Sequence, residues 1–100
     1  MTLENFAEQI GGKVWRKGGK VRIYFDTDKS ANAYLDYDED LGDEFEKGTE
    51  GAALKVFSNC EKQGFEWNKN RAKQIKFDLM KRISSVTGDE ICTDWREVIL

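Results

Sequence analysis

Apolar residues recur at helical spacing in two stretches of the chain. In the first, a candidate N-cap residue, Thr2, precedes four apolar positions, and a glycine pair follows them: Leu3, Phe6, Ala7, Ile10 and then Gly11-Gly12. In the second, between Asn68 and about Val86, the spacing makes one apolar stripe ahead of Gly88, formed by Ala72, Ile75, Leu79, Ile83 and Val86. These patterns predict a short N-terminal helix and a long helix in the second half of the chain.

The residues between these stretches alternate as strands do. Lys13 to Lys17 and Lys20 to Asp26 flank Gly18-Gly19, which predicts a tight hairpin because glycine readily takes positive φ angles. A third strand is predicted over Ala31 to Asp36, with one face made of Ala33, Leu35 and Tyr37.

Two further segments are expected to complete the core. The stretch from Ala52 to Cys60 favours a fourth strand, with a helix as the alternative, and its inward residues would be Leu54, Val56 and Cys60. Near the C-terminus an apolar segment is expected to dock on the core, through Trp95, Val98, Ile99 and Leu100.

The size and composition of the chain agree with this set of elements. A chain of 100 residues with 39% hydrophobic and 35% charged residues suits one domain with one core. We therefore expect a single α+β domain over residues 1–100, in which an antiparallel sheet of three to four strands packs against the long helix. No stretch approaches the roughly 20 apolar residues of a membrane span, and residues 1–10 lack a signal-peptide pattern. These features favour a cytoplasmic protein without a membrane partner.

The residue types that most catalytic and metal sites require are scarce. The chain has no histidine, which removes the usual general base at neutral pH and the commonest metal ligand. Cys60 and Cys92 form no CxxC or Cys/His cluster, and no phosphate-binding glycine loop is present. We expect a binding protein that is not an enzyme and that needs neither cofactor nor metal.

The predicted hairpin carries the first candidate binding surface. A two-residue turn at Gly18-Gly19 would place six side chains on one face: Lys13, Trp15, Lys17, Lys20, Arg22 and Tyr24. Cations interleaved with aromatic rings suit phosphate contacts and base stacking, or an acidic protein surface. The alternative interpretation is a cross-strand cation–π pair between Trp15 and Arg22, with lysines that keep a strand edge soluble.

The long helix carries a second basic group. Lys69, Lys73 and Lys76 share one stripe beside its apolar face. The run Lys69-Asn70-Arg71-Ala72-Lys73 resembles the basic opening of the last helix in double-stranded RNA-binding domains, whose order of helix, three strands and helix is also similar. The resemblance implies phosphate contacts at Lys69 and Lys73. Asn70 replaces an expected lysine and the fourth strand is extra, so a solvated helix face is the alternative.

Charge is segregated along the sequence. Residues 1–25 carry five basic and two acidic groups, whereas residues 26–50 carry two basic and ten acidic groups. One run holds seven carboxylates: Asp36, Asp38, Glu39, Asp40, Asp43, Glu44 and Glu46. Such a run can imitate the phosphates of a nucleic acid and dock in the basic groove of a partner protein, or it can simply aid solubility. A calcium loop is disfavoured because Leu41 and Lys47 stand where an EF-hand needs Gly and Glu.

The segment GGKVWRKGGKVRIYF and the acidic run together are similar to small uncharacterised proteins of bacterial, phage and mobile-element genomes. Some proteins of this kind inhibit nucleic-acid-targeting defence systems, as anti-CRISPR proteins do. The resemblance implies a cytoplasmic inhibitor or adaptor and transfers no functional residue. We therefore expect protein binding through the acidic run, with nucleic-acid binding through the hairpin face and the helix lysines as the alternative.

Overall fold

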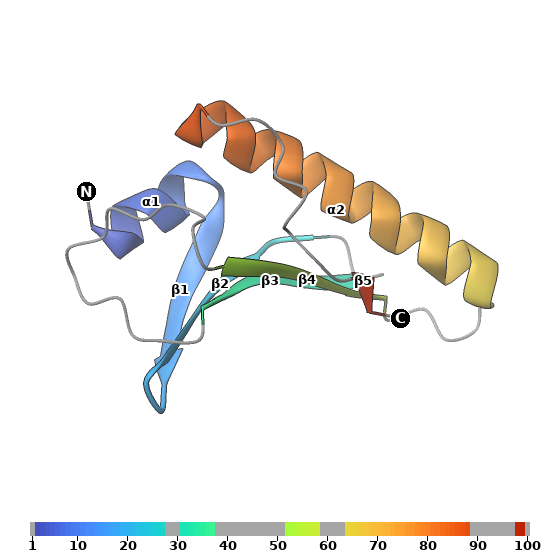
Figure 1. Ribbon diagram of the computed structural model, residues 1–100, viewed down its shortest axis with the longest axis horizontal. Coiled ribbons are helices and arrows are strands. Elements are labelled where there is room, and N and C mark those ends of the chain that lie inside the picture. The colour runs from blue at the N-terminus through green and yellow to red at the C-terminus, as the bar shows by residue number, and fades with distance from the viewer. Residues whose placement is uncertain (1, 28–30, 38–51, 59–63, 89–97, 100) are drawn as a thin grey trace.

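Two helices lie on one face of a five-stranded sheet (Figure 1). The structure is a computed structural model that describes residues 2–27, 31–37, 52–58, 64–88 and 98–99. Its elements, in chain order, are α1 (Leu3–Gln9), β1 (Gly12–Lys17), β2 (Lys20–Phe25), β3 (Ala31–Tyr37), β4 (Ala52–Ser58), α2 (Phe65–Thr87) and β5 (Val98–Ile99). The strands are ordered β1-β2-β3-β4-β5, and all neighbours are antiparallel except β4 and β5. The predicted α+β class is confirmed.

Helix α1 begins where the sequence pattern predicts. The Thr2 side-chain oxygen accepts a hydrogen bond from the backbone N–H of Asn5 at 3.1 Å, which satisfies one of the amide groups left open at a helix start. The apolar side of the helix is buried, through Leu3, Phe6, Ala7 and Ile10. This short helix therefore closes the core over the β1 end of the sheet.

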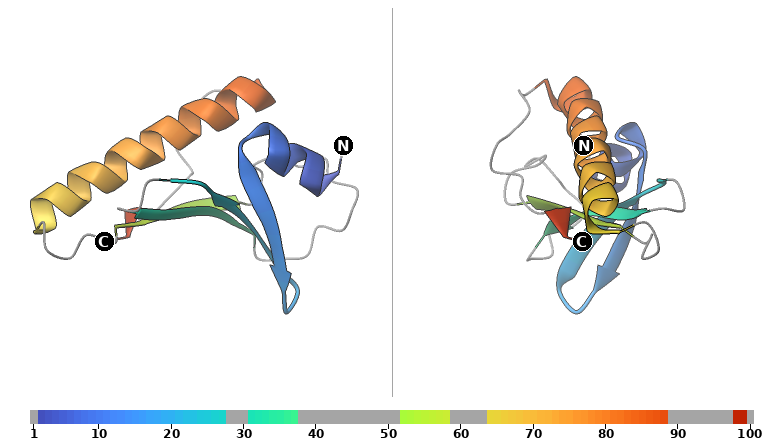
Figure 2. Two further views of the ribbon diagram at one scale, coloured as in Figure 1. Left: turned by 180° about the vertical axis from the view of Figure 1, so that it is seen from behind. Right: turned by 90° about the vertical axis from the view of Figure 1, so that its right-hand side faces the viewer.

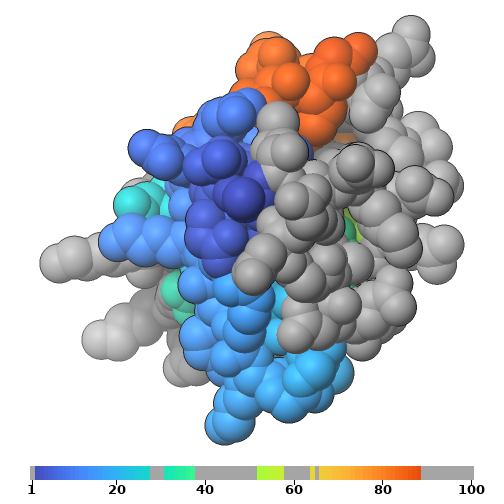
Figure 3. All heavy atoms as spheres, turned by 90° about the vertical axis from the view of Figure 1, so that its left-hand side faces the viewer, coloured from blue at the N-terminus to red at the C-terminus, as the bar shows by residue number. Residues whose placement is uncertain are grey.

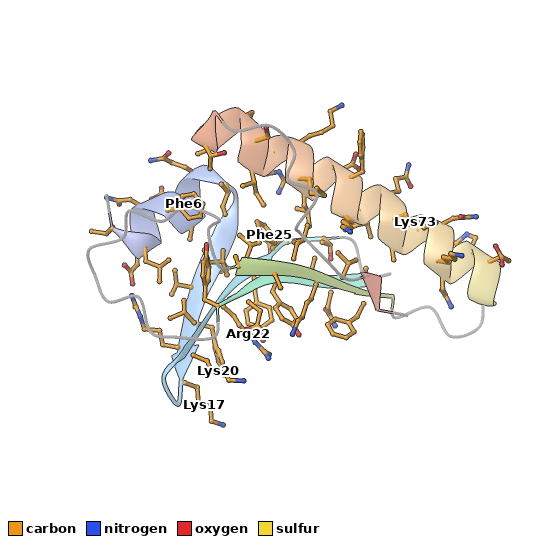
Figure 4. All side chains as sticks on the ribbon, in the orientation of Figure 1. Phe6, Lys17, Lys20, Arg22, Phe25 and Lys73 are labelled. Atoms are coloured by element: carbon orange, nitrogen blue, oxygen red, sulfur yellow. The ribbon has the colours of Figure 1, made fainter. Side chains whose placement is uncertain are left out.

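The hairpin formed by β1 and β2 has the predicted register. Gly18 and Gly19 have φ angles of 60° and 78°, as a tight two-residue turn requires. Lys17 consequently pairs with Lys20, and Trp15 pairs with Arg22. The alternate residues of β2 turn toward the helices and are buried: Val21, Ile23 and Phe25. Figure 4 shows Phe25 on the helix side of the sheet and Arg22 on the other side.

Strands β3 and β4 form the centre of the sheet. The alternative of a helix at Ala52–Ser58 is excluded because this segment pairs with β3 along its length. Leu54 and Val56 point into the core as predicted, whereas Cys60 lies outside the described residues. At the next edge, Val98 and Ile99 pair in parallel with Val56 and Phe57, so this part of the C-terminal segment docks on the sheet. Trp95 and Leu100 lie outside the described residues.

Helix α2 lies above the sheet, on the side that also carries α1 (Figure 2). It begins at Phe65, a turn earlier than the predicted start at Asn68, and Gly88 ends it with a φ of 77° in the left-handed conformation. Most of the predicted stripe is buried, namely Ala72, Ile75, Leu79 and Ile83, and Val86 packs at its edge. These residues join one buried cluster with the inward side chains of α1 and the sheet.

Candidate nucleic-acid interface

The sheet face turned away from α1 and α2 carries the candidate site, and we call it the outer face. No helix or strand among the described residues lies over it (Figures 1 and 2). Strands β1 and β2 bring all six predicted hairpin residues to this face, because directly paired residues of an antiparallel ladder point the same way. Strands β3 and β4 extend it with Tyr34, Asp36, Lys55 and Phe57.

An aromatic row crosses the outer face from β1 to β4. The Trp15 and Tyr24 ring centroids are 6.4 Å apart with their planes at 88°. Tyr24 and Tyr34 follow at 5.3 Å, and Tyr34 and Phe57 stack at 5.8 Å. Trp15 and Tyr24 remain 39% and 37% exposed, whereas Tyr34 is buried beneath its neighbours. The row therefore offers two accessible rings at its hairpin end, supported from the centre of the sheet.

Arg22 lies among these rings. Its guanidinium carbon is 4.5 Å from the Tyr34 ring centroid and 5.7 Å from that of Trp15. The expected cation–π pair between Trp15 and Arg22 is therefore present, and it coexists with the cation and ring arrangement that suits a ligand. The structural and the functional interpretations of this face are compatible.

A carboxylate holds Arg22 in this position. Arg22 Nε donates to Asp36 Oδ1 at 3.1 Å, and Lys55 Nζ donates to Asp36 Oδ2 at 3.0 Å. Burial alone would raise the pKa of the Asp36 carboxyl, but the hydrogen bonds from Lys55 and Arg22 outweigh it and hold the pKa below its ordinary value. Asp36 is consequently ionised at neutral pH, with one oxygen on each cation.

Asp36 is also the first residue of the acidic run that the sequence predicts to bind a protein partner. Its side chain is only 6% exposed and both of its oxygens are engaged within the sheet. The reason is the strand period, which places Asp36 directly opposite Arg22 on β2. The other members of the acidic run lie outside the described residues: Asp38, Glu39, Asp40, Asp43, Glu44 and Glu46.

The lysines of the hairpin give the outer face its positive charge. Lys13, Lys17 and Lys20 are exposed, and no described residue forms an ion pair with them. Figure 4 shows Lys17 and Lys20 reaching away from the sheet beside Arg22, and Figure 3 shows the hairpin projecting beyond α1. Among the described residues of this face, Asp36 is the one carboxylate, and it neutralises part of the charge of Arg22 and Lys55. The described part of the face therefore retains an excess of cations.

The helix lysines do not join this surface. Lys69, Lys73 and Lys76 do share one flank of α2, but α2 packs on the opposite face of the sheet. Figure 4 shows Lys73 on α2, across the sheet from Lys17 and Lys20. The cations predicted from the sequence thus lie on two surfaces, the outer face and one flank of α2. One straight ligand segment cannot contact both.

Three residues of the outer face were not among the predicted site residues. Tyr34, Phe57 and Lys55 reach it because β4 pairs with β3 and places Lys55 opposite Tyr34. A signal was present in the sequence, since Tyr34 and Phe57 are aromatic at strand positions whose neighbours already fill the core.

No group of three or more potential metal ligands occurs among the described residues, and no helix within them is long and apolar enough to cross a membrane. No family model, curated protein or solved structure matches the chain.

Proposed function

We propose that the protein is a non-enzymatic nucleic-acid-binding module that uses the outer face of its sheet. The observation that carries the proposal is the meeting of exposed lysines and exposed aromatic rings on one face of the sheet, which no described helix or strand covers. Phosphates supply charge that lysines attract, and bases supply flat apolar faces that rings attract. The histidine-free composition supports binding over chemistry.

The acidic run remains a separate prediction. Protein binding through this run, including inhibition by imitation of phosphates, depends on the sequence alone because its exposed candidates lie outside the described residues. The outer face carries the stronger argument, since its residues are described and come together in space.

Charge reversal of the hairpin lysines tests the proposal. The variant K13E/K17E/K20E removes three cations from the outer face, and fluorescence anisotropy with a labelled oligonucleotide measures its affinity across a salt series. Each phosphate contact contributes about 0.7 to 0.9 to the slope of log affinity against log salt, so three lost contacts should lower the slope by about 2 to 3. We expect affinity at low salt to fall below detection.

The helix lysines provide a matched control. The variant K69E/K73E/K76E makes the same change in net charge on α2, across the sheet from the hairpin. We expect it to keep most of the affinity and a slope close to that of the unchanged protein. Equal losses in both variants would mean that net charge alone drives binding, and a loss confined to the helix variant would place the interface on α2. Either result contradicts the proposal.

A further inference from the structure

The exposed rings of the outer face restrict the kind of nucleic acid that it can hold. We propose that its ligand is a single strand whose unpaired bases stack on Trp15 and Tyr24. This inference rests on the proposed nucleic-acid-binding function and adds to it the conformation of the ligand. It depends on the geometry of the two rings rather than on charge.

The rings of Trp15 and Tyr24 are accessible, whereas the adjacent ring of Tyr34 is buried. Trp15 and Tyr24 keep 39% and 37% of their surface exposed, whereas Tyr34 is 8% exposed, with Arg22 lying 4.5 Å from its ring centroid. Base stacking on aromatic side chains is tolerant of sequence because every base has a π-face. The hairpin end of the row therefore provides two stacking positions, and Tyr34 supports Tyr24 from the next strand.

The angle between the rings excludes a duplex from these positions. The Trp15 and Tyr24 planes meet at 88°. Two bases that stack on them must also lie nearly perpendicular to each other, whereas the bases of a duplex remain parallel in one continuous stack. A duplex shows the protein only base edges and backbone, so its contacts would be limited to the lysines. A single strand can turn between two bases and use both rings.

The lysines are placed to follow the backbone of such a strand. Lys13 is directly opposite Tyr24, and the Lys17–Lys20 pair follows Trp15 and Arg22 along the same face, toward the hairpin turn. Tyr24 thus has Lys13 beside it on the paired strand, and Trp15 has Lys17 two residues along its own strand on the same face. This arrangement suits a backbone that runs along the hairpin with its bases turned inward.

Three oligonucleotides separate base stacking from phosphate contact. An oligothymidylate of about 12 nucleotides offers bases and phosphates, an abasic strand of equal length offers phosphates only, and a duplex of equal length offers stacked bases. We expect the oligothymidylate to bind about tenfold or more tightly than the abasic strand, because each stacked base contributes roughly 1–3 kcal/mol. An oligouridylate tested in parallel distinguishes RNA from DNA as the source, and tight binding of either strand supports the inference.

Ring variants test the positions directly. W15L/Y24L keeps apolar bulk but removes both rings, and it should lose the advantage of the oligothymidylate while binding the abasic strand as before. W15F/Y24F should restore part of that advantage. F77L is the matched control, since Phe77 is 54% exposed on α2, and it should bind as the unchanged protein does. A thermal melt confirms that each variant is folded.

Different results would overturn the single-strand inference and the proposed function. Equal affinity for the abasic strand and the oligothymidylate, tighter binding of the duplex, or an unchanged preference in W15L/Y24L would overturn the single-strand inference while nucleic-acid binding stands. Absence of binding to all oligonucleotides at low salt would overturn the proposed function itself.

Discussion

Neutralising Asp36 should lower the stability of the fold, because this carboxylate holds two cations of the sheet. Asp36→Asn keeps the shape of the side chain but removes the charge that Arg22 and Lys55 share at 3.1 Å and 3.0 Å. Loss of a hydrogen-bonded charge that is largely buried costs about 1.5–3 kcal/mol, and more where the partners are left buried. Both partners here are more than a quarter exposed and regain some hydration, so we expect a loss of about 2 kcal/mol.

Thermal unfolding followed by circular dichroism measures this loss. For a domain of this size, about 2 kcal/mol corresponds to a fall in Tm of roughly 8–16 °C. Glu4→Gln is the matched control, because it removes the exposed ion pair between Glu4 and Arg16, which should contribute far less than the Asp36 network. A Tm of Asp36→Asn equal to that of the unchanged protein, or equal losses in both variants, would refute the reasoning.

The pH dependence of the same variant provides an independent test. The folded-state pKa of Asp36 lies below its ordinary value, so the unfolded chain takes up this proton at a higher pH than the folded one. The contribution of Asp36 is therefore complete at neutral pH, and it is lost as the pH falls below about 4 and through the folded pKa. The Tm difference between the unchanged protein and Asp36→Asn should shrink over that range. A difference that stays constant would contradict an ionised, paired Asp36.

Two further substitutions test local features of the fold. Thr2→Ala removes the hydrogen bond that Asn5 donates at 3.1 Å and should cost about 1 kcal/mol in urea unfolding, whereas Thr2→Ser should cost little; equal losses would argue against the cap. Gly12→Ala would drive a Cβ into Ile23 Cγ2 in the core and should cost about 1–3 kcal/mol, which a Tm within error of the unchanged protein would contradict.

The elements that the sequence predicts well depend on residues close together in the chain. The Thr2 cap, the Gly18-Gly19 turn and the stripe on α2 are each specified within one helix or one hairpin. The hairpin register follows directly from the length of its turn, which is why the pairing of Trp15 with Arg22 could be predicted. By contrast, the predicted start of α2 at Asn68 misses its first turn, because the N-cap residue is Gly64, which offers no side-chain cap to mark the helix start.

The arrangement of the outer face could only be predicted in part. Its β1 and β2 half follows from the hairpin, but its β3 and β4 half depends on strand pairings between residues far apart in the sequence. Asp36 illustrates the difference. In the sequence, Asp36 is the first residue of an acidic run, but in the sheet its side chain pairs with Arg22 and Lys55. The alternation of Ala33, Leu35 and Tyr37 already places Asp36 on the other face of β3, but the cations that it meets there come from β2 and β4, and those pairings join residues far apart in the sequence.

The Asp36 carboxylate should affect the stability of the fold and its affinity for nucleic acid in opposite directions. Asp36 stabilises the sheet by drawing Arg22 and Lys55 together, and in doing so it lowers the positive charge of the outer face. Asp36→Asn should therefore lower the Tm while it raises affinity for nucleic acid at low salt. If Asp36 instead contacted a protein partner, Asp36→Asn should weaken the binding of that partner and lower the Tm. The direction of the two changes thus separates a residue that organises a cationic surface from a residue that contacts a basic partner.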